Sequence, residues 1–431
     1  MNRWLTPRTI LGIAIAGVIL YGYPGLVSYD SVDQLAQGRH WQLGDWHPPA
    51  MSALWRVVEL FVGGPFGMLV LQTTALVLGA YVIVRDQVSP HTAAIVALAI
   101  AWFPPILTVT GVIWSDPQMA GYLLVGIAAL LSPRPRVRLL GLLAFVLASV
   151  LRHNALAATF APLVLLWGRE QRSLVRRYAL AVVVWIAVTA ASLGINAALV
   201  TEHQHPFARS AAPMDISGII HFAPPITDAA LKQLLSGVPL HVDHELQQAI
   251  AAAYEPRGSF IYFEHPQPLA EPATPAEFAA VAVAWRKLIA AYPLAYAKHR
   301  ATVFQLVVQA RARIAVPALT QTFAYIGTPE LDHELGLAGE PSLVQRGWFW
   351  WVRHCGAIWY APLAYLVISL VLLGFVRGNR VAFAVLGSSL GYELTIFLLA
   401  PAADYRYSHY LLLTTLIALV LVIAKRARRA V

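Results

Sequence analysis

Ten apolar segments are the feature of this chain that most constrains its fold. A helix needs about 20 mostly apolar residues to cross a bilayer, and these segments reach or approach that length. They are residues 10–27, 66–84, 92–109, 117–131, 139–151, 155–167, 178–200, 358–376, 381–400 and 409–424. Several are short or joined by tight turns, so we expect ten to twelve spans. The predicted fold class is an all-α polytopic membrane protein.

The composition agrees with this interpretation. Of the 431 residues, 58% are hydrophobic and only 12% are charged, whereas about 25% of residues are charged in an ordinary soluble domain. This balance excludes a disordered chain, a fibrous repeat and a typical cytosolic enzyme. The single cysteine, Cys355, excludes an intrachain disulfide and a thiolate zinc cluster.

The net charge of +9 is explained by membrane topology, because Lys and Arg collect in cytoplasmic loops. With the N-terminus inside, 16 of the 31 Lys and Arg residues lie in inner segments and 4 lie in short outer loops. We therefore expect both termini in the cytoplasm and no nucleic-acid partner. The first apolar segment follows Arg3 and Arg8 and lacks a small-residue cleavage site, so we predict a retained helix.

Three regions follow from this topology. Residues 1–200 form a transmembrane module of about seven helices, with a first outer loop at 28–65. Residues 201–354 form an extracytoplasmic segment, and 355–431 form a second module of about three helices. Within the outer segment, Phe278–Tyr292 reads as a helix. The apolar run Ala301–Ala310 has basic flanks and is too short to span, so we predict an interfacial helix near 298–314.

Charged residues at membrane depth are rare and are functional candidates by default. Here they gather at the outer ends of the predicted spans. The candidate catalytic residues are Asp30 and Asp116. The candidate substrate-binding residues are His47, Arg152, His153, Asn154, Lys298, His299, Arg300, Tyr405, Arg406 and Tyr407. Their shared side of the membrane is a stronger indication of a site than any single motif.

Purely structural roles are open for the same residues. Asp30 could cap the helix that follows the first span. Asp116, which precedes Pro117, fits an N-cap with proline at the first helical position. Arg152 and Arg406 could be interfacial anchors, and Trp114 reads as an interfacial aromatic without a site role.

These residue types suit transfer of a sugar carried on a polyprenyl phosphate. Arginine can neutralise a leaving phosphate with bidentate hydrogen bonds. A carboxylate can accept the proton that an attacking hydroxyl loses. The sequence contains no Walker-type glycine-rich loop, which is consistent with a lipid donor on the non-cytoplasmic side.

The order of these motifs resembles the GT-C superfamily of integral-membrane glycosyltransferases, which includes protein O-mannosyltransferases and lipid A aminoarabinose transferases. The first span is followed by Asp30 and then by Asp45-Trp46-His47-Pro48-Pro49. Ser115-Asp116-Pro117 matches the acidic residue of a second outer loop, although the lysine common there is missing. Asp404-Tyr405-Arg406-Tyr407 resembles an Arg-Tyr element before a late span. The resemblance covers about the first 155 and the last 30 residues.

The resemblance implies an inverting transfer from a polyprenyl-phosphate sugar to an envelope acceptor, which could be a lipid, a glycan or a protein. The active site would lie on the extracytoplasmic face of a bacterial inner membrane, with Asp30 as the general base. Asp116 would hold the acceptor, orient Asp30 or bind a cationic partner. Arg152, Arg300 and Arg406 compete as phosphate ligands. We expect no essential metal, although the two outer carboxylates leave room for a divalent cation.

Two other functions remain open at this point. An envelope polysaccharide polymerase or ligase would also be polytopic, with outer arginines. A lipid-linked sugar flippase or transporter is disfavoured because such proteins show paired repeats and polar residues near the midplane, whereas here the polar residues lie at one face.

Overall fold

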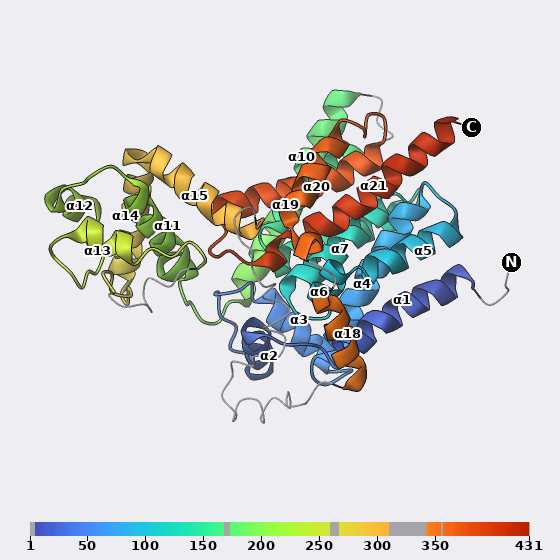
Figure 1. Cartoon of the computed structure of the whole chain (residues 1–431), viewed down its shortest axis with the longest axis horizontal. Coiled ribbons are helices and arrows are strands. Elements are labelled where there is room, and N and C mark those ends of the chain that lie inside the picture. The colour runs from blue at the N-terminus through green and yellow to red at the C-terminus, as the bar shows by residue number, and fades with distance from the viewer. Residues whose placement is uncertain (1–4, 168–172, 259–266, 310–341, 355–356, 431) are drawn as a thin grey trace. The chain divides into compact units, whose positions relative to one another are not determined.

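The computed structural model describes residues 5–167, 173–258, 267–309, 342–354 and 357–430. Every regular element within these ranges is a helix (Figure 1), and β-pairing there is confined to isolated bridges such as Leu26 with Val112. The chain divides into two compact units. The first comprises Met1–Thr201, Arg313–Glu393 and Tyr405–Val431, and the second comprises Glu202–Ala312 and Leu394–Asp404.

The first unit contains the helices of the predicted transmembrane modules. They are α1 (Pro7–Gly22), α2 (Tyr29–His40), α3 (Ala50–Glu59), α4 (Phe66–Arg85), α5 (Pro90–Ala101), α6 (Pro104–Thr110), α7 (Ser115–Leu130), α8 (Pro135–Leu151), α9 (Ala155–Leu166), α10 (Leu174–Leu199), α18 (Leu343–His354), α19 (Pro362–Leu373), α20 (Arg380–Leu399, up to Glu393) and α21 (His409–Ala430). Each of the ten apolar segments thus contains a helix, and the all-α fold of a multi-pass membrane protein is confirmed.

Fewer helices reach membrane-spanning length than the ten to twelve expected. Among the described residues, four are long and apolar enough, or up to six if each of two bent pairs is one span. One pair is α5 and α6, which meet at 71°. Proline accounts for this break because Pro104 lacks the amide hydrogen that would continue α5. Other apolar helices, such as α1 and α9, are shorter than 18 residues.

Close helix packing sets the position of α7, which carries Asp116. Helices α4 and α7 lie side by side (Figure 1). A Cβ on Gly79 of α4 would lie 2.7 Å from Leu124, and one on Gly121 of α7 would lie 3.0 Å from Ala75. The two helices therefore approach through reciprocal glycines, as is common in membranes.

A backbone connection ties the segment between α1 and α2 to the start of α7. Leu26 and Val112 form an isolated parallel bridge, in which the Ile113 amide donates to the Leu26 carbonyl over 2.8 Å. The Ser31 hydroxyl also donates to the Ile113 carbonyl over 2.7 Å. These bonds hold the N-termini of α2 and α7 together, although the two helices are far apart in the sequence.

The second unit packs its helices around a separate apolar core, which includes Ile216, Ile219, Leu231 and Leu288. Its helices are α11 (Ala212–Phe222), α12 (Asp228–Leu234), α13 (Leu246–Ala252), α14 (Pro275–Ala291) and α15 (Pro293–Val307). A π-helical turn, Phe207–Ala211, precedes α11. The expected helix at Phe278–Tyr292 is α14, which starts earlier because Thr274 and Glu277 form a capping box.

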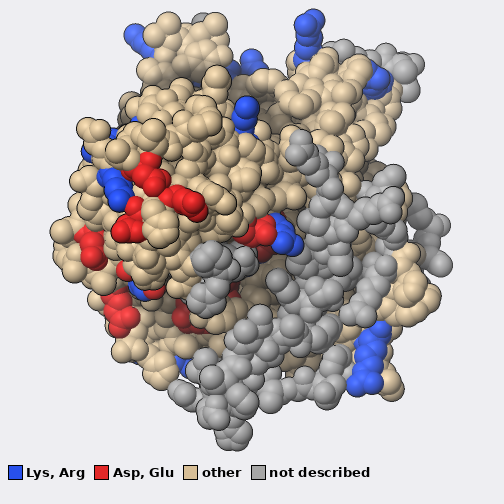
Figure 2. All heavy atoms as spheres, turned by 60° about the vertical axis from the view of Figure 1, so that its left-hand side comes forward, with Lys and Arg blue, Asp and Glu red and all other residues tan. Residues whose placement is uncertain are grey.

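The interfacial helix expected near 298–314 corresponds to α15, which begins at Pro293 and ends at Val307. Residues 310–314 of that prediction lie outside the described residues. Figure 2 shows one face of the molecule, on which charged side chains are few, acidic ones gather in one area, and broad surfaces carry neither acid nor base. This agrees with the low charge content of the sequence.

Helix α18 belongs to the first unit, although the sequence places residues 343–354 in the outer segment. The ring of Tyr21 on α1 meets Phe349 edge-to-face at 5.3 Å between centroids, and Trp102 meets Trp348 at 5.5 Å. This aromatic packing holds α18 against α1 and the end of α5, and such contacts cannot be seen in a hydropathy pattern.

Candidate active site

The two candidate catalytic carboxylates occupy equivalent places at the starts of helices. Ser28 is the N-cap of α2 and forms a capping box with Ser31, so Asp30 lies in the first turn rather than at the cap. Asp116 lies in the first turn of α7, whose N-cap is Trp114. The expectation that Asp116 is an N-cap with proline at the first helical position is therefore wrong. Both carboxylates still gain from the positive end of a helix dipole.

Arg406 lies between these carboxylates. Its Nη2 is 2.5 Å from Oδ2 of Asp30, and its Nε is 3.8 Å from Oδ2 of Asp116. The guanidinium carbon lies 4.8 Å from the centre of the Trp114 ring and 5.7 Å from that of Tyr407. Arg406 belongs to the short 3₁₀ turn Tyr405–Ser408 that precedes α21. It therefore reaches both carboxylates from a third part of the chain.

Arg152, at the end of α8, binds the second carboxylate more firmly. Its Nε lies 3.0 Å from Oδ1 of Asp116 and donates to the Tyr392 hydroxyl over 3.0 Å. Its Nη1 donates to the Ser115 hydroxyl over 3.4 Å, and its guanidinium lies 4.6 Å from the centre of the Tyr407 ring. Arg152 is thus surrounded by protein groups.

Solvent reaches this cluster from one side. The Asp116 side chain is only 1% exposed, whereas Asp30 is 23% and His47 is 27% exposed. His47 Nε2 lies 3.5 Å from Oδ1 of Asp30. A ligand from solution would therefore meet Asp30 and His47 first, and then the guanidinium groups of Arg152 and Arg406, which are 18% and 13% exposed.

The pKa of the Asp30 carboxyl follows from these contacts. Burial by itself raises this pKa, but the positive charge of Arg406 and the hydrogen bond and charge of His47 outweigh burial. The pKa is therefore held well below its ordinary range, and Asp30 is ionised at neutral pH. Burial raises the pKa of Asp33, one turn further along α2.

Asn196 of α10 supports the loops around the cluster. Its Nδ2 donates to the Val150 carbonyl over 3.0 Å and lies 3.1 Å from Nε2 of His153, while its Oδ1 accepts from the Ala50 amide over 3.4 Å. His153 is exposed and serves this connection, and Asn154 lies at the start of α9. Of these two predicted residues, His153 connects the end of α8 to α10.

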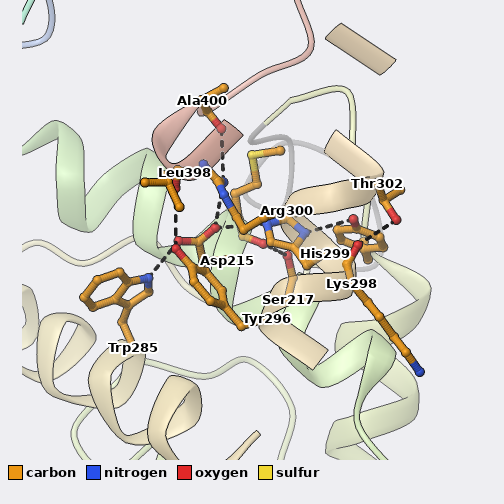
Figure 3. Close-up of polar contacts among 12 residues, drawn as sticks. Asp215, Ser217, Trp285, Tyr296, Lys298, His299, Arg300, Thr302, Leu398 and Ala400 are labelled. Carbon is orange, nitrogen blue, oxygen red and sulfur yellow. Dashed lines mark hydrogen bonds and ion pairs between the residues drawn. The ribbon is translucent and has the colours of Figure 1, made fainter. Parts of the chain in front are cut away.

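Three predicted residues belong to the second unit, where they surround or flank Asp215 (Figure 3). His299 Nε2 and Arg300 Nη1 each lie 2.9 Å from Oδ1 of Asp215, and Trp285 donates to Oδ2 over 2.8 Å. Arg300 also donates to the carbonyls of Phe397 and Ala400. Lys298 points away from this cluster (Figure 3). His299 and Arg300 thus hold helices of the second unit together.

Of the predicted residues, the structure brings together Asp30, His47, Asp116, Arg152, Arg406 and Tyr407. Tyr405 is buried, and its ring is 5.8 Å from that of Tyr360. Sequence reasoning missed Tyr392 and the contact between Trp114 and Arg406. A signal was available for Tyr392, because its neighbour Glu393 is an acidic residue inside an apolar span and is 2% exposed.

The described residues offer a metal ion few suitable ligands. Within the described ranges, no group of three or more His, Cys, Asp or Glu side chains is arranged to hold one. Both carboxylates face guanidinium groups, whose positive charge disfavours a second cation nearby. The absence of an essential metal stays a prediction.

No protein-family model matches the sequence, and no curated protein does either. Among solved structures, the chain is similar to ArnT from Cupriavidus metallidurans bound to undecaprenyl phosphate, with 16% identity, a TM-score of 0.36 and coverage of 98% of this chain and 78% of that one. It is also similar to the apo oligosaccharyltransferase of Archaeoglobus fulgidus, with 14% identity, a TM-score of 0.38 and coverage of 99% of this chain and 51% of that one. Likeness at this level says nothing by itself about what this chain binds.

Proposed function

We propose that this protein is a GT-C-type membrane glycosyltransferase. It transfers a sugar from a polyprenyl-phosphate donor to a hydroxyl of an envelope acceptor, on the extracytoplasmic face of a bacterial inner membrane. The observation that carries the proposal is the cluster of Asp30, Arg406 and Asp116, which brings two carboxylates and a guanidinium to one solvent-accessible place. The proposed donor is of the same chemical class as the undecaprenyl phosphate with which ArnT was solved.

The reaction assigns a role to each group. The acceptor oxygen attacks the anomeric carbon from the face opposite the phosphate, and the carbon–oxygen bond to the phosphate breaks. The acceptor proton passes to the Asp30 carboxylate, and polyprenyl phosphate leaves as a monoester. Attack from the opposite face inverts the configuration at the anomeric carbon.

The phosphate needs a cation where its negative charge increases during bond breaking. Arg406 suits this role better than Arg152, because its partner Asp30 is 23% exposed, whereas Arg152 is bound to the 1%-exposed Asp116 and to the Tyr392 hydroxyl. Arg300 binds Asp215 and two backbone carbonyls in the second unit. We therefore assign the donor phosphate to Arg406 and the orientation of the site to Arg152.

Asp30→Asn tests the base, because it keeps the size of the side chain and removes its basicity. With purified protein and a polyprenyl-phosphate sugar, turnover should fall by about 10²- to 10⁴-fold, the usual contribution of a general base, while expression and donor binding persist. The matched control is Asp33→Asn on the same helix, which should turn over normally. Near-normal turnover of Asp30→Asn would refute the assignment.

The donor ligand and the product need separate tests. Arg406→Ala should weaken donor binding, and an unchanged donor affinity would remove this residue from the phosphate site. Comparing envelope lipids and glycans by mass spectrometry, with and without the gene, would identify the product. A single added sugar supports the transferase, whereas loss of a polymer ladder on deletion would indicate the polymerase or ligase instead.

A further inference from the structure

The charges of the cluster are already matched within the protein. Two carboxylates, Asp30 and Asp116, face two guanidinium groups, those of Arg406 and Arg152. A phosphate that entered this cluster would add negative charge to a group of side chains whose charges already balance. It can gain a guanidinium only by taking one from a carboxylate, so donor binding and carboxylate pairing compete.

Of the ion pairs in the cluster, the pair of Arg406 and Asp30 requires the least free energy to separate. Arg152 would have to leave a carboxylate that is 1% exposed and a tyrosine hydroxyl, and stripping a buried charge of its partner is expensive. Asp30 is 23% exposed and keeps His47 at 3.5 Å. Water and His47 can therefore take over the carboxylate when Arg406 turns away.

Aromatic rings provide a place for the released guanidinium. The Arg406 carbon lies over Trp114 at 4.8 Å and near Tyr407 at 5.7 Å, distances at which a cation is attracted to a ring face. The Trp114 indole donates to the Ser28 hydroxyl over 2.6 Å, which fixes the ring against the start of α2. Arg406 can thus change its anionic partner while it stays on the same aromatic support.

We propose that the donor phosphate takes Arg406 from Asp30, so that the empty site keeps its own base masked and donor binding unmasks it. This inference rests on the proposed function and adds a regulation to it. An arginine-paired carboxylate is a poor proton acceptor, because the pair stabilises its ionised form. The exchange therefore makes the donor the first substrate to bind, and it prepares Asp30 for the acceptor hydroxyl.

Binding of a polyprenyl monophosphate such as undecaprenyl phosphate to the purified full-length protein tests the exchange without turnover. Asp30→Asn removes the competitor of the phosphate, so its affinity should rise by about tenfold, equivalent to about 1.4 kcal/mol. Arg406→Gln should lower the affinity. In the double variant Asp30→Asn/Arg406→Gln, the gain from Asp30→Asn should disappear, because no guanidinium is left to release.

Two controls separate the exchange from other effects. Asp33→Asn removes a carboxylate one turn away, which accepts from Gln37 rather than from arginine. Because this change releases no guanidinium, it should leave the affinity within about twofold, well below the roughly tenfold gain expected for Asp30→Asn. Arg406→Met, measured in parallel, shows whether the loss depends on the charge rather than on the substituted amide. Thermal unfolding checks that each variant is folded.

The outcomes are distinct. If Asp30→Asn leaves the affinity unchanged or lowers it, the exchange is refuted. It is also refuted if the gain in affinity persists in the double variant. In both cases the binding of the lipid phosphate itself remains supported. If the wild-type protein binds no polyprenyl monophosphate, the donor class of the proposed function fails and the exchange fails with it. A gain that Asp33→Asn reproduces would indicate general electrostatic repulsion and would also refute the exchange.

Discussion

Gly218→Ala should unfold or loosen the second unit, because Gly218 leaves room for the His299 ring. A Cβ built at this position would lie 2.1 Å from Nδ1, 2.3 Å from Cγ and 2.7 Å from Cε1 of His299. Ordinary contact begins at 3.4 Å, so the ring would have to move by about 1.3 Å. The imidazole is completely buried and has little space for such a shift.

The displacement would break bonds that the second unit depends on. His299 is bonded on both nitrogens, to Asp215 at 2.9 Å and to the Tyr254 hydroxyl at 2.9 Å. Overpacking costs about 1–3 kcal/mol, and a buried acceptor that loses a donor costs about 1–3 kcal/mol. Alanine regains about 1 kcal/mol in a helix. Together these terms give a net loss of about 1–5 kcal/mol, against a total stability of about 5–15 kcal/mol for a typical native protein.

Hydrogen exchange on the full-length protein measures this loss locally, through reduced protection of α11 and α15. The control is Gly194→Ala in α10, where a Cβ meets nothing within 4 Å and the helix should be unchanged or slightly more stable. The double variant Gly218→Ala/His299→Ala should lose less stability than the sum of the losses of the two single variants, because the smaller side chain at 299 relieves the clash. Unchanged protection in Gly218→Ala would refute the packing argument.

Three further predictions concern the first unit. Asp116→Asn leaves the Arg152 guanidinium without its carboxylate, so the stability measured by thermal unfolding should fall by about 3–5 kcal/mol. The double variant Asp116→Leu/Arg152→Met should recover much of the lost stability but none of the turnover. An Asp116→Asn protein as stable as the wild type would contradict this prediction. Because the pKa of Asp30 is lowered in the folded protein, its contribution to stability is present above its unfolded pKa of about 3.9 and is lost as pH falls through the lower folded value. In pH–rate profiles, kcat/KM reports the pKa of Asp30 in the free enzyme, and kcat reports its pKa in the donor complex, in which Arg406 has left Asp30. The acid-side decline of kcat should therefore occur at a higher pH than that of kcat/KM. If the two declines occur at the same pH, the exchange is contradicted. Asn196→Ala removes the links to Ala50, Val150 and His153 and should lower stability by about 1–2 kcal/mol. It should also lower kcat, because the bond to Ala50 holds the backbone three residues after His47; an unchanged kcat would show that other contacts position His47.

Sequence reasoning could locate the helices and the side chains at their ends. Apolar length is a local property, so the ten segments can be read directly, and each contains a helix. The placement of Asp30 and Asp116 just before or within the first turn of a helix is equally local. Exact helix ends were less predictable, because prolines and caps shift them by a few residues, as at Pro104 and at the capping box that begins α14.

The pairing of charges was decided by tertiary structure alone. Asp30 and Arg406 are separated by most of the chain, and nothing near either residue specifies the other. The parallel bridge at Leu26 and Val112 joins α2 to α7, and the turn before α21 brings Arg406 to both. The same holds for Arg300, which the sequence predicted as a phosphate ligand because it is an arginine, and which instead binds Asp215. Residue type and membrane depth are properties of a segment, whereas the choice of partner depends on how segments pack, because an ion pair requires its two atoms within a few ångströms of each other.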